Sequence, residues 1–239
     1  MQKLQALVKD ISAHAALNNA FYATWMTQKL SIKQIAVFVR NYWEFAYRFP
    51  ESLAMLLIKT ENVAARAEYA KTLYSEMGYG NPTQVHSSLF ELFCQELSNQ
   101  LGNASFLKMD SLKESHSLLV TTNNFINGQK ELYSSDSSIA VGAQLALEWQ
   151  AYTMISKLYE GARNYMDLWP SVDTFHEACE FFYVHIGSAE KEHKEESIIA
   201  ASKVIDDGGS YEGVEYGYNK HLKLISEFWQ GIASEINKL

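Results

Sequence analysis

Hydrophobic residues recur every three or four positions along most of this chain, which is the spacing of one buried face of an α-helix. The pattern is strongest in residues 32–59, where one face carries Phe38, Tyr42, Phe45, Phe49 and Leu53. Ser31 precedes this segment and is a suitable N-cap, because its hydroxyl can accept a hydrogen bond from a backbone N–H of the first turn. Glu44 lies beside the aromatic face, and we expect it to be solvated rather than a metal ligand.

The same spacing extends to most of the remaining sequence. It predicts helices in residues 2–27, 62–76, from 83 onward, 108–128, 139–165, 173–205 and 211–237. Short segments rich in Gly, Pro, Asn, Asp or Ser separate these helices, at 77–82, 101–103, 134–138 and 206–209. No strand pattern, internal repeat or interdomain linker is evident in the sequence. We therefore predict one all-α domain over residues 1–239, a bundle of seven to nine helices.

Composition narrows the class of protein. The chain has only three prolines in 239 residues, which favours long helices because proline interrupts them. A formal net charge of −8 argues against nucleic acid or an anionic membrane as a partner. No run approaches the ~18 apolar residues of a membrane-spanning helix, and the N-terminus lacks the apolar core of a signal peptide. The two cysteines form no zinc or redox motif, so we expect a reducing, cytoplasmic location.

One segment concentrates side chains that can bind metals. Residues 181–196, FFYVHIGSAEKEHKEE, contain His185 and His193 with Glu190 and Glu192 between them. Imidazole and carboxylate groups together suit iron, manganese or zinc. The alternative for this segment is an amphipathic helix with solvated charges and no metal.

Two further segments place carboxylate or imidazole groups where a bundle can bring them together. Glu76 and His86 stand on either side of a Gly- and Pro-containing turn, which can place both at one level of the bundle. Glu148 lies in LALEWQAY, where its helical neighbours are largely apolar, so it is expected to face the interior. A buried carboxylate requires a cation or a proton. Several carboxylates and histidines on different helices are typical of a two-metal site in a bundle core, yet these residues alone support a metal-free bundle equally well.

Four stretches, in their order and spacing, resemble a known family. They are NNAFYATWMTQKLS at 18–31, FVRNYWEFAYRFPESLA at 38–54, EMGYGNPTQVHSSLF at 76–90, and Glu148 followed by LYEG at 158–161. Together they are similar to the haem-oxygenase-like di-iron oxidases, and within them to the group of the Chlamydia protein associating with death domains. The resemblance covers about residues 14–205.

The resemblance implies a ligand set and a reaction. The six implied metal ligands are Glu76, His86, Glu148, His185, Glu190 and His193. They would hold two ferrous ions per chain, with manganese as the alternative metal. The implied reaction is the activation of O₂ and the oxidation of a small organic or amino-acid-derived substrate. The resemblance also implies that the chain forms a homodimer.

The helix that carries His185 departs from the family's pattern by one inserted residue. The family spaces its ligands as His, three residues, Asp, two residues, His, whereas four residues separate His185 from Glu190. At about 100° per residue, these two side chains lie roughly 140° apart on a regular helix. A π-bulge would absorb the extra residue and return Glu190 and His193 to the face of His185. On a regular helix Glu192 would occupy that face instead, and Ala189 would fill the acidic position.

Three other functions use the same scaffold. A haem oxygenase would use His14 as axial ligand, and a thiaminase-like enzyme would use Cys94 or Cys179 as nucleophile. A non-catalytic interaction protein with a degenerate metal site is the third. Four tyrosines are either redox-active or part of the core, and these are Tyr22, Tyr42, Tyr152 and Tyr183.

Overall fold

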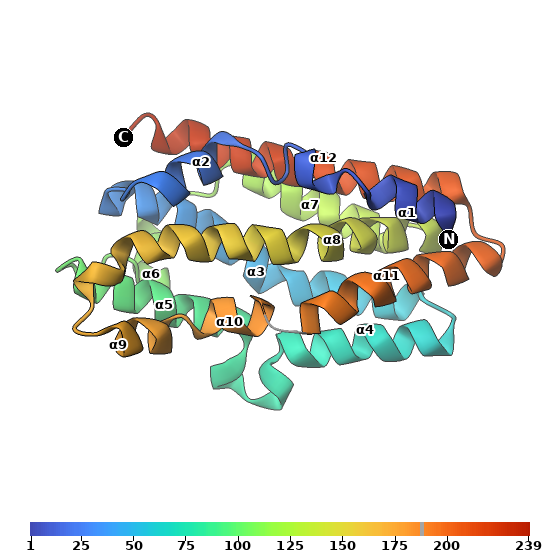
Figure 1. The fold of residues 1–239 in the computed structure, drawn as a ribbon, viewed down its shortest axis with the longest axis horizontal. Helices are drawn as coiled ribbons and strands as arrows, with labels where there is room; N and C mark the ends of the chain where they lie inside the picture. Colours follow the sequence, from blue (N-terminus) through green and yellow to red (C-terminus); the bar gives the residue numbers. More distant parts are fainter. Residues whose placement is uncertain (187–188) are drawn as a thin grey trace.

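A computed structural model shows an all-α bundle, as predicted (Figure 1). It describes the backbone of residues 1–186 and 189–239, and the side chains of 1–186 and 194–239. The α-helices in these residues are α1 (Gln2–Val8), α2 (Ala20–Thr27), α3 (Ile32–Lys59), α4 (Val63–Glu76), α5 (His86–Gln100), α6 (Met109–Ser115), α7 (Val120–Ser134), α8 (Ser137–Ala162), α9 (Val172–Ala178), α10 (Glu180–Ile186), α11 (Ala189–Asp206) and α12 (Tyr211–Ile236). Short 3₁₀ helices are η1 (Ile11–Ala13), η2 (Gly78–Gly80), η3 (Pro82–Gln84) and η4 (Arg163–Leu168).

The expected number of helices, seven to nine, was wrong, because the described residues contain twelve α-helices. Three predicted helices are divided. Segment 2–27 forms α1, η1 and α2, segment 108–128 falls in α6 and α7, and segment 173–205 is interrupted at Cys179 between α9 and α10. Between α6 and α7, the amide of Leu119 donates to Asn41 Oδ1 at 3.0 Å, a tertiary bond to α3 that replaces a helical one.

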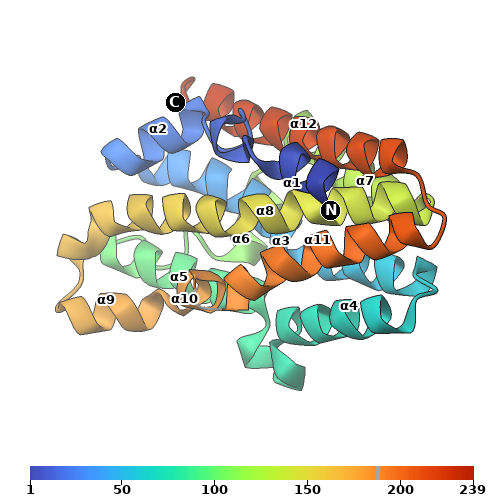
Figure 2. The same ribbon diagram turned by 45° about the vertical axis from the view of Figure 1, so that its right-hand side comes forward.

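The long helices α3, α7, α8 and α12 form the body of the bundle (Figures 1 and 2). Helices α8 and α12 run side by side and approach closely at two glycines. A Cβ atom at Gly142 would lie 2.1 Å from the carbonyl oxygen of Val214, and one at Gly217 would lie 2.1 Å from that of Ile139. Their lack of side chains therefore sets the separation of α8 from α12.

Helix α3 begins at the predicted cap. Ser31 accepts a hydrogen bond from the amide of Gln34, and the Gln34 side chain accepts one from the amide of Ser31, which completes a capping box. The expectation that Glu44 is solvated was wrong. Its carboxylate is buried and accepts hydrogen bonds from Arg40 at 2.8 Å and Arg48 at 3.2 Å. These partners compensate the charge, since both lie one turn away on the same helix.

An aromatic core joins α2, α3 and α12. Phe21 stacks on Trp229 with ring centroids 5.0 Å apart, and Phe38 and Tyr42 extend the cluster along α3. Trp25 ties α2 to α8, because its indole N–H donates to the carbonyl of Leu158 at 2.8 Å. The core therefore connects α8, through α2, to α3 and α12.

A buried histidine makes the stability of this fold depend on pH. His221 on α12 is fully buried, and neither ring nitrogen has a hydrogen-bond partner among the described residues. Burial lowers its pKa from 6.5 to about 3, so the folded state keeps the ring neutral while the unfolded state binds a proton. Stability is therefore lost as pH falls below about 6.5, with a slope of about 1.4 kcal/mol per pH unit until the folded pKa is reached.

Replacing His221 by Leu should remove this dependence. Between pH 7.5 and 4.5 we expect the wild-type chain to lose about 2–3 kcal/mol more unfolding free energy than the variant. Urea unfolding at both pH values measures the difference, and His116→Gln, at an exposed hydrogen bond to Ser115, is the control. Equal losses in the wild type and the Leu variant would contradict the prediction.

Candidate metal centre

Two of the expected ligands meet at the turn between α4 and α5. Glu76 is the last residue of α4 and His86 is the first of α5. The chain reverses through η2 and η3, and the Glu76 Oε2 atom lies 3.0 Å from His86 Nδ1. Both side chains are largely buried, with 13% and 10% of their surface exposed. The turn therefore brings a carboxylate and an imidazole into direct contact inside the bundle.

Gly78 allows this turn to close. Its φ is +63°, which favours glycine, and a Cβ atom there would lie 2.4 Å from the carbonyl carbon of Gln84. The turn backbone consequently packs on itself without room for a side chain. Gly78→Ala should separate Glu76 from His86, and if these residues bind iron as the sequence predicts, the substitution should weaken that binding at least tenfold, measured by chelator competition. Gly102→Ala, at a positive φ with open space around it, is the matched control. Unchanged iron affinity in Gly78→Ala would contradict this account of the turn.

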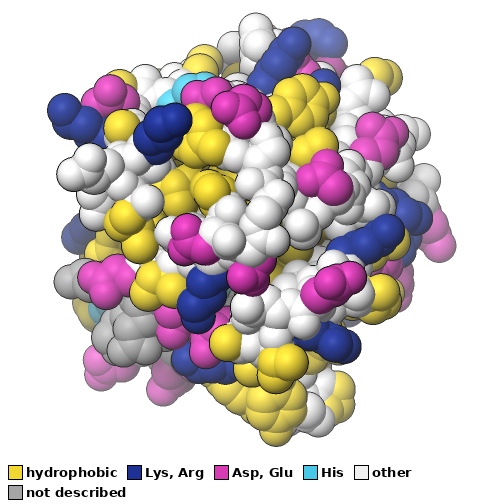
Figure 3. Space-filling view, turned by 90° about the vertical axis from the view of Figure 1, so that its right-hand side faces the viewer, with side chains coloured by type: hydrophobic (Ala, Val, Ile, Leu, Met, Phe, Trp, Pro, Cys, Tyr) yellow, Lys and Arg dark blue, Asp and Glu magenta, His cyan; other side chains and the backbone are white. Residues whose placement is uncertain are grey.

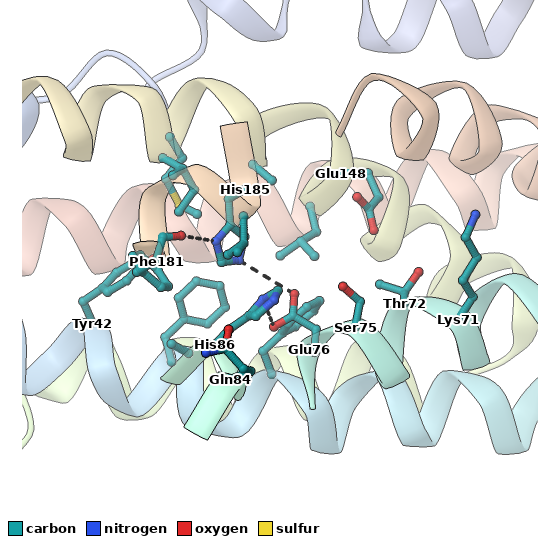
Figure 4. Close-up of a pocket in the computed structure, with 18 of the residues that line it drawn as sticks. Tyr42, Lys71, Thr72, Ser75, Glu76, Gln84, His86, Glu148, Phe181 and His185 are labelled. Carbon is teal, nitrogen blue, oxygen red and sulfur yellow. Dashed lines mark hydrogen bonds and ion pairs between the residues drawn. The ribbon is translucent and has the colours of Figure 1, made fainter. Parts of the chain in front are cut away.

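His185 completes a cluster of three donors (Figure 4). Its Nε2 atom lies 3.9 Å from Glu76 Oε1, and its ring centroid lies 4.4 Å from that of His86. One ligand atom from each of the three residues falls within 4.8 Å of the others. The His185 Nδ1–H donates to the carbonyl of Phe181 at 2.7 Å, which orients the ring with Nε2 toward Glu76. Metal-binding histidines are commonly oriented by such a backbone hydrogen bond.

Glu148 lies beside this cluster. It is 7% exposed and lines the same cavity, so the expectation that it faces the interior is confirmed. Gln144, one turn earlier on α8, donates a short hydrogen bond to its Oε1 atom, and Gln144 in turn accepts one from Tyr133 at 2.6 Å. In Figure 4 Glu148 lies on the opposite side of His185 from Phe181, and its carboxylate is outside the three-donor cluster. The described structure thus contains a compact triad with a fourth, separately anchored carboxylate.

The remaining predicted ligands, Glu190 and His193, lie outside the described side chains, as does Glu192. The structure describes α10 up to Ile186 and helical backbone again from Ala189. The expected π-bulge falls on the span between them. Whether Glu190 or Glu192 joins the site therefore stays a prediction.

The triad and Glu148 line one cavity of about 360 Å³. Its walls are mostly apolar, with Phe45, Phe49, Leu147, Met154 and Ile155 among them. Cavities of this size and character accommodate small organic molecules. Burial raises the pKa of the Tyr42 phenol, which also faces the cavity, and the charge of Glu76 raises it further. Tyr42 is therefore a neutral wall residue.

Sequence reasoning missed the residues that support the ligands. Gln144 holds Glu148, and Lys71, Thr72, Ser75 and Tyr79 line the cavity toward the surface. The signal for the α4 residues was present, since Lys71, Thr72 and Ser75 lie on the helical face leading to Glu76. The backbone carbonyl of Phe181, which orients His185, could not be predicted from the sequence, because every residue has a backbone carbonyl.

The residues expected by the alternative functions lie elsewhere. His14 is on the loop after η1, where Nδ1 accepts a hydrogen bond from the amide of Ala16 at 3.1 Å, and it does not line the cavity. Cys94 and Cys179 are buried, and burial raises the pKa of both thiols, that of Cys179 to about 12. A raised pKa keeps a thiol protonated and suits a core residue better than a nucleophile.

A family model described as an iron-containing redox enzyme, of the haem-oxygenase type, matches residues 36–208. The fold is similar to that of a CADD-like protein of unknown function from Nostoc punctiforme, with a TM-score of 0.69, 17% identity, and 98% of this chain and 99% of that one covered. It is also similar to a TenA homologue from Pseudomonas syringae, with a TM-score of 0.75, 13% identity, and 100% and 92% covered. A TenA homologue from P. horikoshii gives a TM-score of 0.63 at 13% identity, covering 98% and 97%.

At these low identities the solved structures establish the fold alone. No curated protein sequence gives a significant match. Among the described residues, no helix is both long and apolar enough to cross a membrane.

Proposed function

This chain belongs to the family of haem-oxygenase-like, iron-containing redox enzymes, and from that premise we propose that it is a non-haem di-iron oxidase or oxygenase. Its substrates would be O₂ and a small organic or amino-acid-derived molecule. The observation that carries the proposal is the convergence of Glu76, His86 and His185 at one end of a largely apolar cavity.

The donor set fits iron. Two imidazoles and one carboxylate, with coordination positions left open, form the ligand set typical of non-haem Fe(II) oxygenases. Here Glu76, His86 and His185 supply these donors from α4, α5 and α10. Glu148, Glu190 and His193 would hold a second iron or a manganese ion. The first site rests on described geometry, and the second on Glu148 together with the family's ligand pattern.

The chain's own residues determine how such a centre works. Bound ferrous iron would supply the electrons that O₂ activation requires. The Glu76 carboxylate contacts the imidazoles of both His86 and His185. The backbone carbonyl of Phe181 accepts a hydrogen bond from His185 and so fixes the orientation of its ring. Gln144 holds the Glu148 carboxylate in place against the cavity. The apolar walls beside the donors would limit the access of water to reactive species, which protects them from side reactions.

Oxygen uptake tests the proposal. Anaerobic reconstitution with ferrous iron should give two iron ions per chain, and admitting air should give O₂ uptake faster than that of the same ferrous concentration in buffer. His86→Ala should lose both properties, whereas His116→Ala, at the half-buried residue that follows α6, should retain them. Iron-loaded protein that takes up O₂ no faster than free ferrous iron would refute the oxidase assignment.

A further inference from the structure

The turn between Glu76 and His86 has a strained backbone. Three successive residues have positive φ, with 63° at Gly78, 54° at Tyr79 and 84° at Gly80. Glycine adopts this conformation readily, whereas it is unfavourable for an L residue with a large side chain. Burial does not compensate at Tyr79, because this residue is 66% exposed. The strain opposes the closed turn, so the contacts of the Tyr79 side chain must help to keep it closed.

The Tyr79 side chain reaches back to the end of α4. Ser75 Oγ donates a hydrogen bond to Tyr79 Oη at 3.0 Å, and the Tyr79 ring packs edge-to-face on Tyr74 with centroids 5.5 Å apart. Tyr74 also lies against the next residue of the turn, since a Cβ atom at Gly80 would be 3.8 Å from its ring. Tyr74 and Ser75 directly precede Glu76 in the last turn of α4. These three residues, Tyr74, Ser75 and Tyr79, form a clamp that ties η2 to α4.

The clamp holds one side of η2, and backbone contacts hold the other. A Cβ atom at Gly78 would lie 2.4 Å from the carbonyl carbon of Gln84, so η2 packs directly on η3. Two hydrogen bonds close the turn itself. The amide of Gly80 donates to the carbonyl of Met77 at 3.2 Å, and the amide of Asn81 donates to that of Gly78 at 2.9 Å. The turn thus joins α4, which ends in one metal ligand, to η3, which leads to the other.

The clamp lies at the surface, away from the core of the bundle. Tyr74, Met77 and Tyr79 are all exposed on the segment that projects below the bundle in Figure 1. Figure 3 shows hydrophobic side chains gathered at that lower end. Because these contacts are local and exposed, their loss should loosen the turn without unpacking the helices.

We propose that the clamp keeps the turn between Glu76 and His86 closed and thereby retains the bound metal ion. Its members are positioning residues, since none of them belongs to the three donors of the triad. When the turn opens, Glu76 and His86 move apart, and a metal ion held by both loses a ligand. The rate of metal loss should therefore follow the frequency of turn opening. The inference rests on the proposed function for the metal, and deepens it by identifying what governs metal retention.

Hydrogen exchange of the turn in the metal-free chain tests the inference first. The protection factors of the Gly80 and Asn81 amides, measured by NMR, report how often the turn opens. Ser75→Ala and Tyr79→Phe remove the same hydrogen bond and keep the backbone strain, so each should lower these factors about threefold. The double variant should lower them no further, because both substitutions act on one interaction. Tyr74→Leu, which loses the edge-to-face contact, should also lower them about threefold.

Iron release is the second measurement. After anaerobic reconstitution with ferrous iron, transfer of iron to an excess of chelator should be about threefold faster in each single variant than in the wild type, in step with the loss of protection. Ser115→Ala and Tyr216→Phe remove a hydroxyl at exposed positions on α6 and α12, and both should match the wild type in the two measurements.

Three results would overturn the clamp. They are unchanged protection in Ser75→Ala and Tyr79→Phe, a double variant whose effect is the product of the two single effects, and unchanged iron release despite lower protection. A wild-type chain that binds no iron would refute the oxidase assignment and the role in metal retention. The protection factors of the metal-free chain would then separately decide whether the clamp closes the turn.

Discussion

Glu76→Gln should abolish iron binding, because Glu76 contacts both histidines of the triad. The amide keeps the size of the side chain but removes the negative charge that balances a divalent cation. We expect the affinity for ferrous iron to fall at least a hundredfold, beyond the loss caused by mutating a residue that only supports a ligand. Chelator competition followed by iron analysis measures the change.

The fold should survive this substitution. Glu76 ends α4 and contributes to no helix cap, so circular dichroism and the thermal midpoint should match those of the wild type. Glu114→Gln, on the exposed surface of α6, controls for the loss of one carboxylate. If Glu76→Gln retains wild-type iron content while folded, the triad is not the metal site.

The second large effect concerns the inserted residue between His185 and Glu190. We expect Glu190→Ala to halve the iron content and to abolish O₂ uptake, because Glu190 is the predicted sixth ligand and loss of one ligand empties one of two sites. Glu192→Ala should leave both quantities unchanged, which makes it the matched control on the same helix. The regular-helix alternative predicts the opposite pair of outcomes.

A third outcome would have wider consequences. If neither substitution changes iron stoichiometry or O₂ uptake, residues 190–193 are part of an ordinary charged helix that holds no metal, and the di-iron oxidase assignment falls. The triad of Glu76, His86 and His185 would then remain as the described group of donors that could hold a metal.

The sequence predicted long, regular helices well and interrupted ones poorly. The bounds of α3 followed from its aromatic stripe and from the cap at Ser31. The stretch 2–27 kept a helical spacing through residues that are not helical, since Ala16 and Leu17 are buried from a loop. Apolar spacing reports burial, and a buried loop produces the same signal as a helix.

Glycines and charges were misjudged where tertiary contacts decide their role. Gly128 was expected to end a helix, but α7 continues to Ser134 and a Cβ at Gly128 would lie 2.6 Å from Leu224. This glycine serves close packing against α12 and does not terminate the helix. Glu44 was expected in solvent, yet Arg40 and Arg48 pair with it in the interior. The role of Gly128 depends on which helix lies opposite, whereas Arg40 and Arg48 lie four residues from Glu44 on the same helix, and only the burial of that face depends on tertiary packing.

The candidate site was predicted in part for a clear physical reason. Glu76 and His86 are joined by a short turn, and the apolar neighbours of Glu148 indicated an interior position. These are local properties of the sequence. The packing of His185 against His86 and the support of Glu148 by Gln144 depend on how α10 and α8 pack in the bundle, which spacing alone does not determine.

The most direct test of the metal site is anomalous diffraction at the iron edge from crystals of the ferrous-reconstituted chain. The structure predicts a peak within bonding distance, about 2.0–2.2 Å, of donor atoms of Glu76, His86 and His185. A crystal of iron-reconstituted protein with no anomalous peak at this triad, or with its peaks elsewhere, would contradict the account.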